Sequence, residues 1–287
     1  MYDFISINKS NIPKLKELSE NCCKFNILNE NFSEYYNHSS FFKKLLVYNK
    51  IKLLTHNNNI IGYIWVEKLS YSSLHINSMY ILDKEAQSDS YRYLITSFKN
   101  KNYSYHCQKN HTNYDILTDI GFEKGKGTYN MSMFLYNAVD IAEDSSIEFE
   151  SLIKGKQEDL RCIIQNEVFK NDTRTPLTID DIYYDELQSY YFKEGAVFIK
   201  YNNDYAGYGQ IIVNNNIPTI VNVGILPQYR KKGLGKQLIL YLLMLAEKNG
   251  YSEIKLKVSA ENYVAINMYK ALGFTINGEC NYFQYKK

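Results

Sequence analysis

A strand that runs through a basic, glycine-containing turn directly into a helix constrains the fold of this chain more than any other feature. The β-branched residues 219–225 predict the strand, and the leucine-rich residues from about 233 to 249 predict the helix. Gly233 and Gly235 leave the backbone of the turn open to a ligand, because neither residue carries a Cβ. The first amide N–H groups of the helix point at the same place, at the positive end of its dipole. The turn therefore predicts a binding site for a pyrophosphate group.

Two common phosphate-binding patterns do not fit this turn. The P-loop pattern G-x-x-x-x-G-K-S/T occurs nowhere in the chain. The dinucleotide pattern G-x-G-x-x-G would need a glycine at position 238, which is Leu238. It would also need an acidic residue at the end of the next strand, whereas Glu253 lies at the beginning of that strand. A third pattern, Q/R-x-x-G-x-G/A, fits residues 230–235 in full.

A second motif follows at the spacing that this third pattern leads one to expect. After a predicted strand at residues 252–259, residues 262–274 fit N-x-x-A-x-x-x-Y-x-x-x-G-F, with Asn262 first and Tyr269 near the centre. The first pattern resembles motif A of the GNAT superfamily of N-acetyltransferases, and the second resembles motif B. The resemblance covers about residues 197–274. It implies an α/β fold with a mixed sheet, an acetyl-CoA donor bound by its pyrophosphate at motif A, and no metal.

The resemblance also implies a role for individual residues. The turn would bind the pyrophosphate, the end of the preceding strand would pair with the pantetheine arm, and Asn262 would bond a pantetheine amide. The residues of the strand end and the turn are Val223, Gly224, Ile225, Arg230, Lys231, Lys232, Gly233, Leu234, Gly235 and Lys236. Gly224 is expected at a bulge that opens the sheet. The alternatives without ligand binding are a solvent-exposed basic turn for residues 230–236 and a helix cap for Asn262.

Tyr269 is the candidate general acid. A phenol with an ordinary pKa near 10 stays protonated at neutral pH and can donate to a departing thiolate. The alternative is a tyrosine that only packs the helix against the sheet. The general base stays open, because residues 217–223 contain no carboxylate and no histidine. The alternatives are a water relay positioned by Asn222, Tyr190 or Tyr191, and an acidic residue between 157 and 192 that reaches the site.

The two halves of the chain echo each other at an offset of 152 residues. This offset places Gly121 on Gly273 and Asn110 on Asn262. A polar turn followed by a strand at residues 57–66 also matches residues 202–212. We infer an internal duplication, and hence two tandem GNAT-like domains.

The first copy lacks the features that would bind acetyl-CoA. Its turn, at residues 81–90, has no glycine and carries Asp83, Glu85 and Asp89, whose charges repel a pyrophosphate. Leu117 stands at the position that matches Tyr269. The sequence therefore predicts a degenerate GNAT-like domain at residues 1–140 and a catalytic GNAT domain at residues 141–287.

Composition excludes some partners. The 33 basic and 31 acidic residues nearly balance, which argues against a nucleic-acid binder. The longest apolar run, residues 238–246, is far too short to span a membrane, and the beginning of the sequence does not read as a secretory signal. We therefore expect a cytoplasmic N-acetyltransferase that acts on a small-molecule or peptide amine. The alternative is a non-catalytic protein that binds or senses acyl-CoA.

Overall fold

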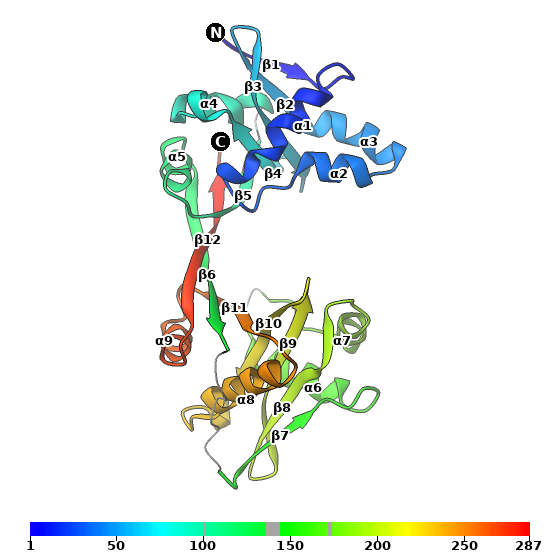
Figure 1. The fold of residues 1–287 in the computed structure, drawn as a ribbon, viewed down its shortest axis with the longest axis vertical. Coiled ribbons are helices and arrows are strands. Elements are labelled where there is room, and N and C mark those ends of the chain that lie inside the picture. The colour runs from blue at the N-terminus through cyan, green and yellow to red at the C-terminus, as the bar shows by residue number, and fades with distance from the viewer. Residues whose placement is uncertain (100, 136–143, 172–173) are drawn as a thin grey trace. The chain divides into compact units, whose positions relative to one another are not determined.

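The computed structural model describes residues 1–99, 101–135, 144–171 and 174–287, and they form two compact units (Figure 1). Unit 1 contains Met1–Thr128, Ser259–Glu261 and Gly278–Lys287, and unit 2 contains Tyr129–Val258 and Asn262–Asn277. The predicted domains are contiguous in sequence, whereas these units exchange short segments. The predicted boundary between residues 140 and 141 lies outside the described residues. That residues 1–140 and 141–287 function as separate domains stays a prediction.

Unit 2 is a mixed α/β unit in which helices cover both faces of a sheet. The strand order that concerns it is β6-β11-β10-β9-β8-β7, antiparallel except for the parallel pair β10 and β11. The strands are β7 (Ile147–Ser151), β8 (Tyr191–Tyr201), β9 (Asp204–Asn214), β10 (Ile217–Ile225) and β11 (Glu253–Ser259), together with the end of β6 (Glu123–Phe134). The helices are α6 (Glu158–Val168), α7 (Ile179–Glu186), α8 (Leu234–Lys248) and α9 (Tyr263–Ala271), with the short η5 (Pro227–Tyr229) before α8.

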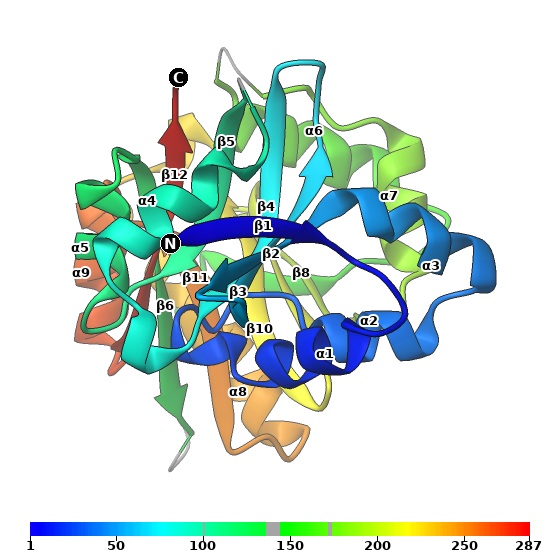
Figure 2. The same ribbon diagram turned by 90° about the horizontal axis from the view of Figure 1, so that it is seen from above.

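Unit 1 repeats this arrangement around the order β1-β2-β3-β4-β5-β12. Its strands are β1 (Tyr2–Ser6), β2 (Ile51–His56), β3 (Asn59–Lys68), β4 (Ser73–Ile81), β5 (Asn102–Gln108) and the end of β12 (Thr275–Tyr285). Its helices are α1 (Ile12–Glu20), α2 (Phe32–His38), α3 (Phe41–Val47), α4 (Ser88–Leu94) and α5 (Asn113–Asp119), with the short η1 (Cys22–Lys24), η2 (Tyr48–Lys50), η3 (Asp83–Glu85) and η4 (Ile95–Ser97). Helices α1, α2 and α3 lie together, away from α4 and α5 (Figure 2).

Asparagine pairs form three of the hairpin turns. The paired residues are Asn57 with Asn58, Asn202 with Asn203, and Asn215 with Asn216, and all six have a positive φ. Asparagine tolerates the left-handed region better than most residues, and two such residues in succession match the twist of a hairpin. The polar turns predicted at the beginning of residues 57–66 and 202–212 are therefore confirmed.

Apolar residues fill a separate core in each unit. One cluster in unit 1 contains Trp65 and the fully buried Leu117. In unit 2 a large cluster joins α8 and α9 to one face of the sheet, and a smaller cluster joins α6 to Phe198 and Tyr208 on the other face. The sheet of unit 2 is thus covered on both faces, as the α/β prediction requires.

The segment after α7 forms a strand. Helix α7 ends at Glu186, and Tyr191 already begins β8, opposite Ile212. Its apolar and aromatic residues suit either structure, and pairing with β9 decides between them. Tyr190 and Tyr191 therefore lie at the start of a strand instead of on a helix.

Candidate active site

Strands β10 and β11 separate at the point where the site was predicted. Their parallel pairing comprises Thr219 with Lys255 and Ile220 with Leu256. Beyond these pairs β10 continues to Ile225, with a bulge between Val221 and Gly224 in its pairing with β9. The last residues of β10 thus have an edge that β11 does not occupy. An extended ligand could pair with that edge as an added strand.

Asn222 makes the bulge, and Gly224 makes room behind it. Asn222 has a φ of 57°, which is a left-handed conformation, whereas Gly224 has no positive φ. A Cβ on Gly224 would lie 2.0 Å from Cγ1 of Val168 in α6. Gly224 thus borders the bulge as predicted, but its lack of a side chain serves close packing against α6 and not an unusual backbone conformation.

The turn before α8 forms an open cradle of backbone amides. Gly233 is the N-cap of α8, with a φ of 79°. Within the described part of the chain, no hydrogen-bond acceptor is recorded for the amides of Gly233, Leu234 and Gly235. A Cβ built on Gly235 would meet Cγ1 of Ile225 at 3.8 Å and Sδ of Met268 at 4.0 Å, so β10, α8 and α9 converge beside this cradle. These orphan amides at a helix N-terminus suit a pyrophosphate.

The basic side chains of the turn lie around its outside. Arg230 Nε donates to the carbonyl oxygen of Ile225 at 3.0 Å, and Nζ of Lys232 lies 5.0 Å from the centre of the Tyr201 ring. Lys231 has a φ of 63° and, like Lys236, is exposed. Leu234 differs from its neighbours because it is buried in the core under α8. Its side chain anchors the turn, and only its backbone amide faces the cradle.

Tyr269 is buried but keeps its hydroxyl free of protein partners. Its ring packs edge-on against Phe274, with the centroids 5.7 Å apart. Among the described residues no hydrogen bond to its hydroxyl is recorded. Burial raises the pKa of Tyr269 to about 12. The neutral phenol is therefore the stable form at every physiological pH, and it can donate a hydrogen bond to an incoming group.

Asn262 caps α9 and still has an unused donor. Its Oδ1 accepts a hydrogen bond from the amide of Ala265 at 3.1 Å, so Asn262 is a helix cap, as the structural alternative proposed. Its Nδ2 has no recorded partner within the described ranges. The cap fixes the side chain at the N-terminus of α9 and leaves Nδ2 available for a carbonyl group.

A buried polar network lies behind the bulge, and the sequence did not reveal it. Arg161 Nη2 lies 2.6 Å from Oδ2 of Asp185 and 3.1 Å from Oε1 of Gln210. Gln210 Nε2 donates to Oδ2 of Asp185 at 3.2 Å. Tyr190 donates to Oδ1 of Asp185 at 3.0 Å, and Nδ2 of Asn222 donates to Oε1 of Gln210 at 3.2 Å. Of the alternatives for the base, this network includes Asn222, Tyr190 and one acidic residue, Asp185.

In unit 1 another part of the chain bonds to both of the corresponding strands where they separate. Strands β4 and β5 pair in parallel over residues 73–76 and 102–105 and then separate. Asn26 bonds β5 there, donating to the carbonyl of His106 at 2.8 Å and accepting from the amide of Gln108 at 3.1 Å. Glu30 donates its amide to the carbonyl of Asn77 on β4 at 3.0 Å. We call residues 24–30 the plug.

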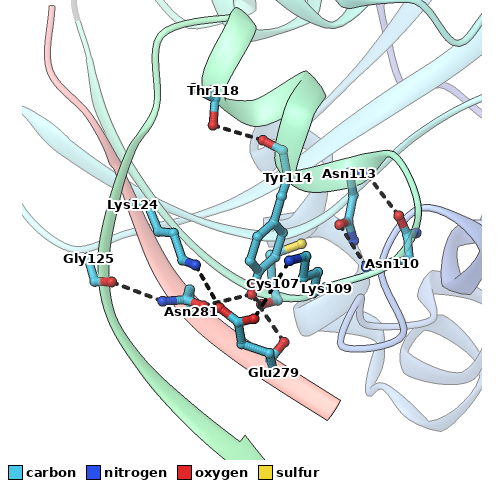
Figure 3. A network of polar contacts seen from close by, with 10 residues as sticks. All are labelled: Cys107, Lys109, Asn110, Asn113, Tyr114, Thr118, Lys124, Gly125, Glu279 and Asn281. Carbon is cyan, nitrogen blue, oxygen red and sulfur yellow. Dashed lines mark hydrogen bonds and ion pairs between the residues drawn. The ribbon is translucent and has the colours of Figure 1, made fainter. Parts of the chain in front are cut away.

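Asn110 occupies the position in unit 1 that matches Asn262, and both atoms of its side-chain amide form hydrogen bonds. Its Oδ1 accepts from the amide of Asn113 at 2.8 Å, and its Nδ2 donates to the carbonyls of Lys24 and Phe25 at 3.1 and 2.9 Å. Figure 3 shows Asn110 and Asn113 beside Tyr114 in this region. Unit 1 therefore shows that a capping asparagine at this position can hold carbonyl groups at the same time.

The split strands, the amide cradle and the helix that carries Tyr269 all lie in one stretch of the chain that is similar to a known family. Residues 164–274 match the Acetyltransferase (GNAT) family. The ribosomal protein bS18-alanine N-acetyltransferase of Escherichia coli is 39% identical over 56 residues, which are 20% of this chain and 38% of that protein. The chain thus spans less than half the length of this curated relative.

Solved structures match the whole chain at the level of the fold. A GCN5-related N-acetyltransferase from Sphaerobacter thermophilus has a TM-score of 0.69 at 13% identity, covering 99% of this chain and 95% of that one. A tandem GNAT protein from the clavulanic acid biosynthesis pathway has a TM-score of 0.58 at 7% identity, covering 99% and 98%. The predicted fold of two tandem GNAT-like domains is therefore confirmed.

No described helix is both long and apolar enough to cross a membrane. Nor do the described ranges contain a group of three or more His, Cys, Asp or Glu side chains suited to holding a metal ion.

Proposed function

We propose that unit 2 is an acetyl-CoA-dependent N-acetyltransferase for a small-molecule or peptide amine. The observation that carries the proposal is the amide cradle at Gly233 and Gly235 beside the free edge of β10. The cradle would hold the pyrophosphate and the edge of β10 the pantetheine arm, as the GNAT family implies. Asn262 Nδ2 would bond a carbonyl of that arm. The cytoplasm remains the predicted location.

The reaction needs an oriented thioester, a neutral amine and a donor for the departing sulfur. The amine nitrogen attacks the thioester carbonyl carbon, the C–S bond breaks, and the acetyl group stays on nitrogen. The nitrogen loses one proton to solvent, and the sulfur gains one. Tyr269 would donate a hydrogen bond to the sulfur. A phenol with a pKa of about 12 is a much weaker acid than a thiol with a pKa near 8.5. Tyr269 would therefore donate a hydrogen bond to the thiolate and keep its own proton, and the thiolate would take its proton from solvent.

A non-catalytic acyl-CoA-binding protein is the second candidate, because β10 carries no carboxylate or histidine. Calorimetry with the full chain tests the shared part of both proposals, and we expect one acetyl-CoA per chain. Gly235→Glu should weaken binding at least about tenfold, since it places a carboxylate in the cradle. Asn249→Glu, at the exposed other end of α8, is the control. Unchanged affinity in Gly235→Glu would refute the site, and thiol release with an amine separates the enzyme from the binding protein.

A further inference from the structure

The network behind the bulge has a fixed direction, and Arg161 sets it. A guanidinium group only donates hydrogen bonds, so the Gln210 atom that faces Arg161 must be the oxygen Oε1. The amide nitrogen of Gln210 then faces Asp185, a carboxylate that accepts. The Asn222 atom that meets Gln210 Oε1 must in turn be the donor Nδ2. One buried positive charge thus decides which way two side-chain amides point.

The network ends in one acceptor at the bulge. With Nδ2 committed to Gln210, the remaining polar atom of Asn222 is Oδ1, and the described residues offer it no recorded partner. Asn222 is half-buried and lies on the part of β10 that β11 leaves unpaired, two residues before Gly224. Gln210 and Arg161, which are 0% and 1% exposed, hold it from behind. Because its partners are buried, the orientation of Asn222 is well defined.

We propose that Asn222 Oδ1 accepts a hydrogen bond from the acceptor amine and that the acceptor is an α-amine of a peptide or amino acid. This inference rests on the proposed function. An amide oxygen carries no net charge, so it orients an amine without stabilising the ammonium form as a carboxylate would. The acceptor must therefore arrive largely neutral. An α-amine, with a pKa near 8, is about one-third neutral at pH 7.5, whereas a lysine-type amine is neutral in about one molecule in a thousand.

The pH dependence distinguishes this arrangement from an enzyme base. If the protein supplies no base, the acid limb of kcat/KM follows the pKa of the acceptor itself. We therefore expect the acid limb to move upward by about 2.5 pH units when an alanine-initiated peptide without lysine is replaced by an Nα-acetyl-lysine amide, whose ε-amine is free. At pH 7.5 the alanine peptide should be favoured by roughly 300-fold. An acid limb at the same pH for both probes would overturn the inference.

Two substitutions at position 222 separate the side chain from the backbone. Asn222→Gly keeps the left-handed conformation and removes the oxygen, so kcat/KM for the alanine peptide should fall about tenfold with the acetyl-CoA affinity unchanged. Asn222→Asp keeps the shape and adds a charge. The acid limb of kcat/KM should then follow the pKa of the new carboxylate and be the same for both acceptors. The preference for the α-amine over the lysine amine should decrease. A loss below twofold in Asn222→Gly would contradict the role.

Gln210→Met tests whether Gln210 acts through Asn222. The substitution keeps the length of the side chain and removes its hydrogen bonds. It should lower kcat/KM in the natural chain and have little further effect in Asn222→Gly, because positions that act in sequence are not additive. Additive losses would contradict the relay. If acetyl-CoA binds but neither probe is acetylated, the proposed function is wrong. If both probes are acetylated without a preference for the α-amine, only the present inference is wrong.

Discussion

The two units share one strand arrangement and differ in what occupies the gap between their parallel strands. In unit 2 the end of β10 has a free edge, and a left-handed glycine begins α8. In unit 1 the plug bonds both β4 and β5, and α4 begins from Gln87. The plug thus bonds backbone groups of β4 and β5 with which a ligand could otherwise pair. The sequence predicted a degenerate site from the acidic turn, its lack of glycine and Leu117, and the plug adds a further physical reason.

The interiors behind the two grooves differ as well. When Gly62 of β3 is aligned with Gly207 of β9, Tyr63 and Trp65 fall where unit 2 has Tyr208 and Gln210. Trp65 is buried in the apolar core of unit 1, whereas Gln210 belongs to the polar network that holds Asn222. Unit 2 thus has buried polar groups behind its bulge at a position where unit 1 has a buried tryptophan.

The largest expected effect concerns Tyr269. Tyr269→Phe removes the hydroxyl and keeps the ring against Phe274, so turnover should fall on the order of a hundredfold while acetyl-CoA affinity stays the same. Steady-state kinetics and calorimetry measure the two quantities. As a control, Tyr263→Phe changes an exposed tyrosine on the same helix and should have no effect. A kcat within threefold of the natural chain would make Tyr269 structural, like Leu117 in unit 1.

The plug provides the next largest effect. Asn26 is 1% exposed, and Asn26→Ala would remove its hydrogen bonds to the carbonyl of His106 and from the amide of Gln108. Unit 1 should lose about 2 kcal/mol of stability. Trp65 is the one tryptophan of the chain and lies in this unit, so its fluorescence during urea denaturation reports the loss.

Acetyl-CoA stoichiometry is the decisive second measurement for Asn26→Ala. We expect it to stay at one per chain, because the acidic turn of unit 1 still repels a pyrophosphate. A second bound acetyl-CoA would show that the plug alone closes unit 1. Asn249→Ala, at an exposed helix end in unit 2, should leave the fluorescence transition unchanged.

Local patterns predicted the elements of the site, but not the contacts that complete it. The strand, turn and helix around Gly233 depend on neighbouring residues, and they are confirmed. The bond from Arg161 to Gln210 joins residues 49 positions apart, and the bond from Asn26 to His106 joins residues 80 apart. Neither pair belongs to a recurring spacing. Long-range hydrogen bonds between single polar residues leave no periodic signal that one sequence can reveal.

The C-terminal strand gives a smaller effect, confined to unit 1. Tyr114 bonds through its hydroxyl to the carbonyls of Cys107 and Glu279 and to Oδ1 of Asn281, all within 3.1 Å (Figure 3). Tyr114→Phe should lower the stability reported by Trp65 by about 1 kcal/mol without changing acetyl-CoA affinity. Tyr71→Phe, at an 86% exposed position, is the control. Equal transitions for both variants would mean that this network does not fasten β12 to unit 1. A fragment of residues 141–287 would carry Gly278–Lys287 without the rest of unit 1, so the test uses the full chain.

The smallest expected effect concerns Glu186 in the polar interior of unit 2. Burial, and then the charge of Glu158, raise the pKa of Glu186, and its Oε1 has no hydrogen-bond partner among the residues described. A carboxyl group with a raised folded-state pKa binds more protons in the folded state, so its contribution to stability falls as the pH rises above the ordinary value near 4.3. Glu186→Gln should therefore stabilise unit 2 at pH 7.5, by less than about 1 kcal/mol, and have little effect at pH 4. Hydrogen exchange of the α6 and α7 amides, compared at both pH values, measures the difference locally. The ion pair with Lys154, 3.9 Å away and partly exposed, opposes this gain only weakly. Faster exchange in the variant at pH 7.5 would show that the carboxylate is held by favourable contacts, and that the interior of unit 2 tolerates its charge without strain.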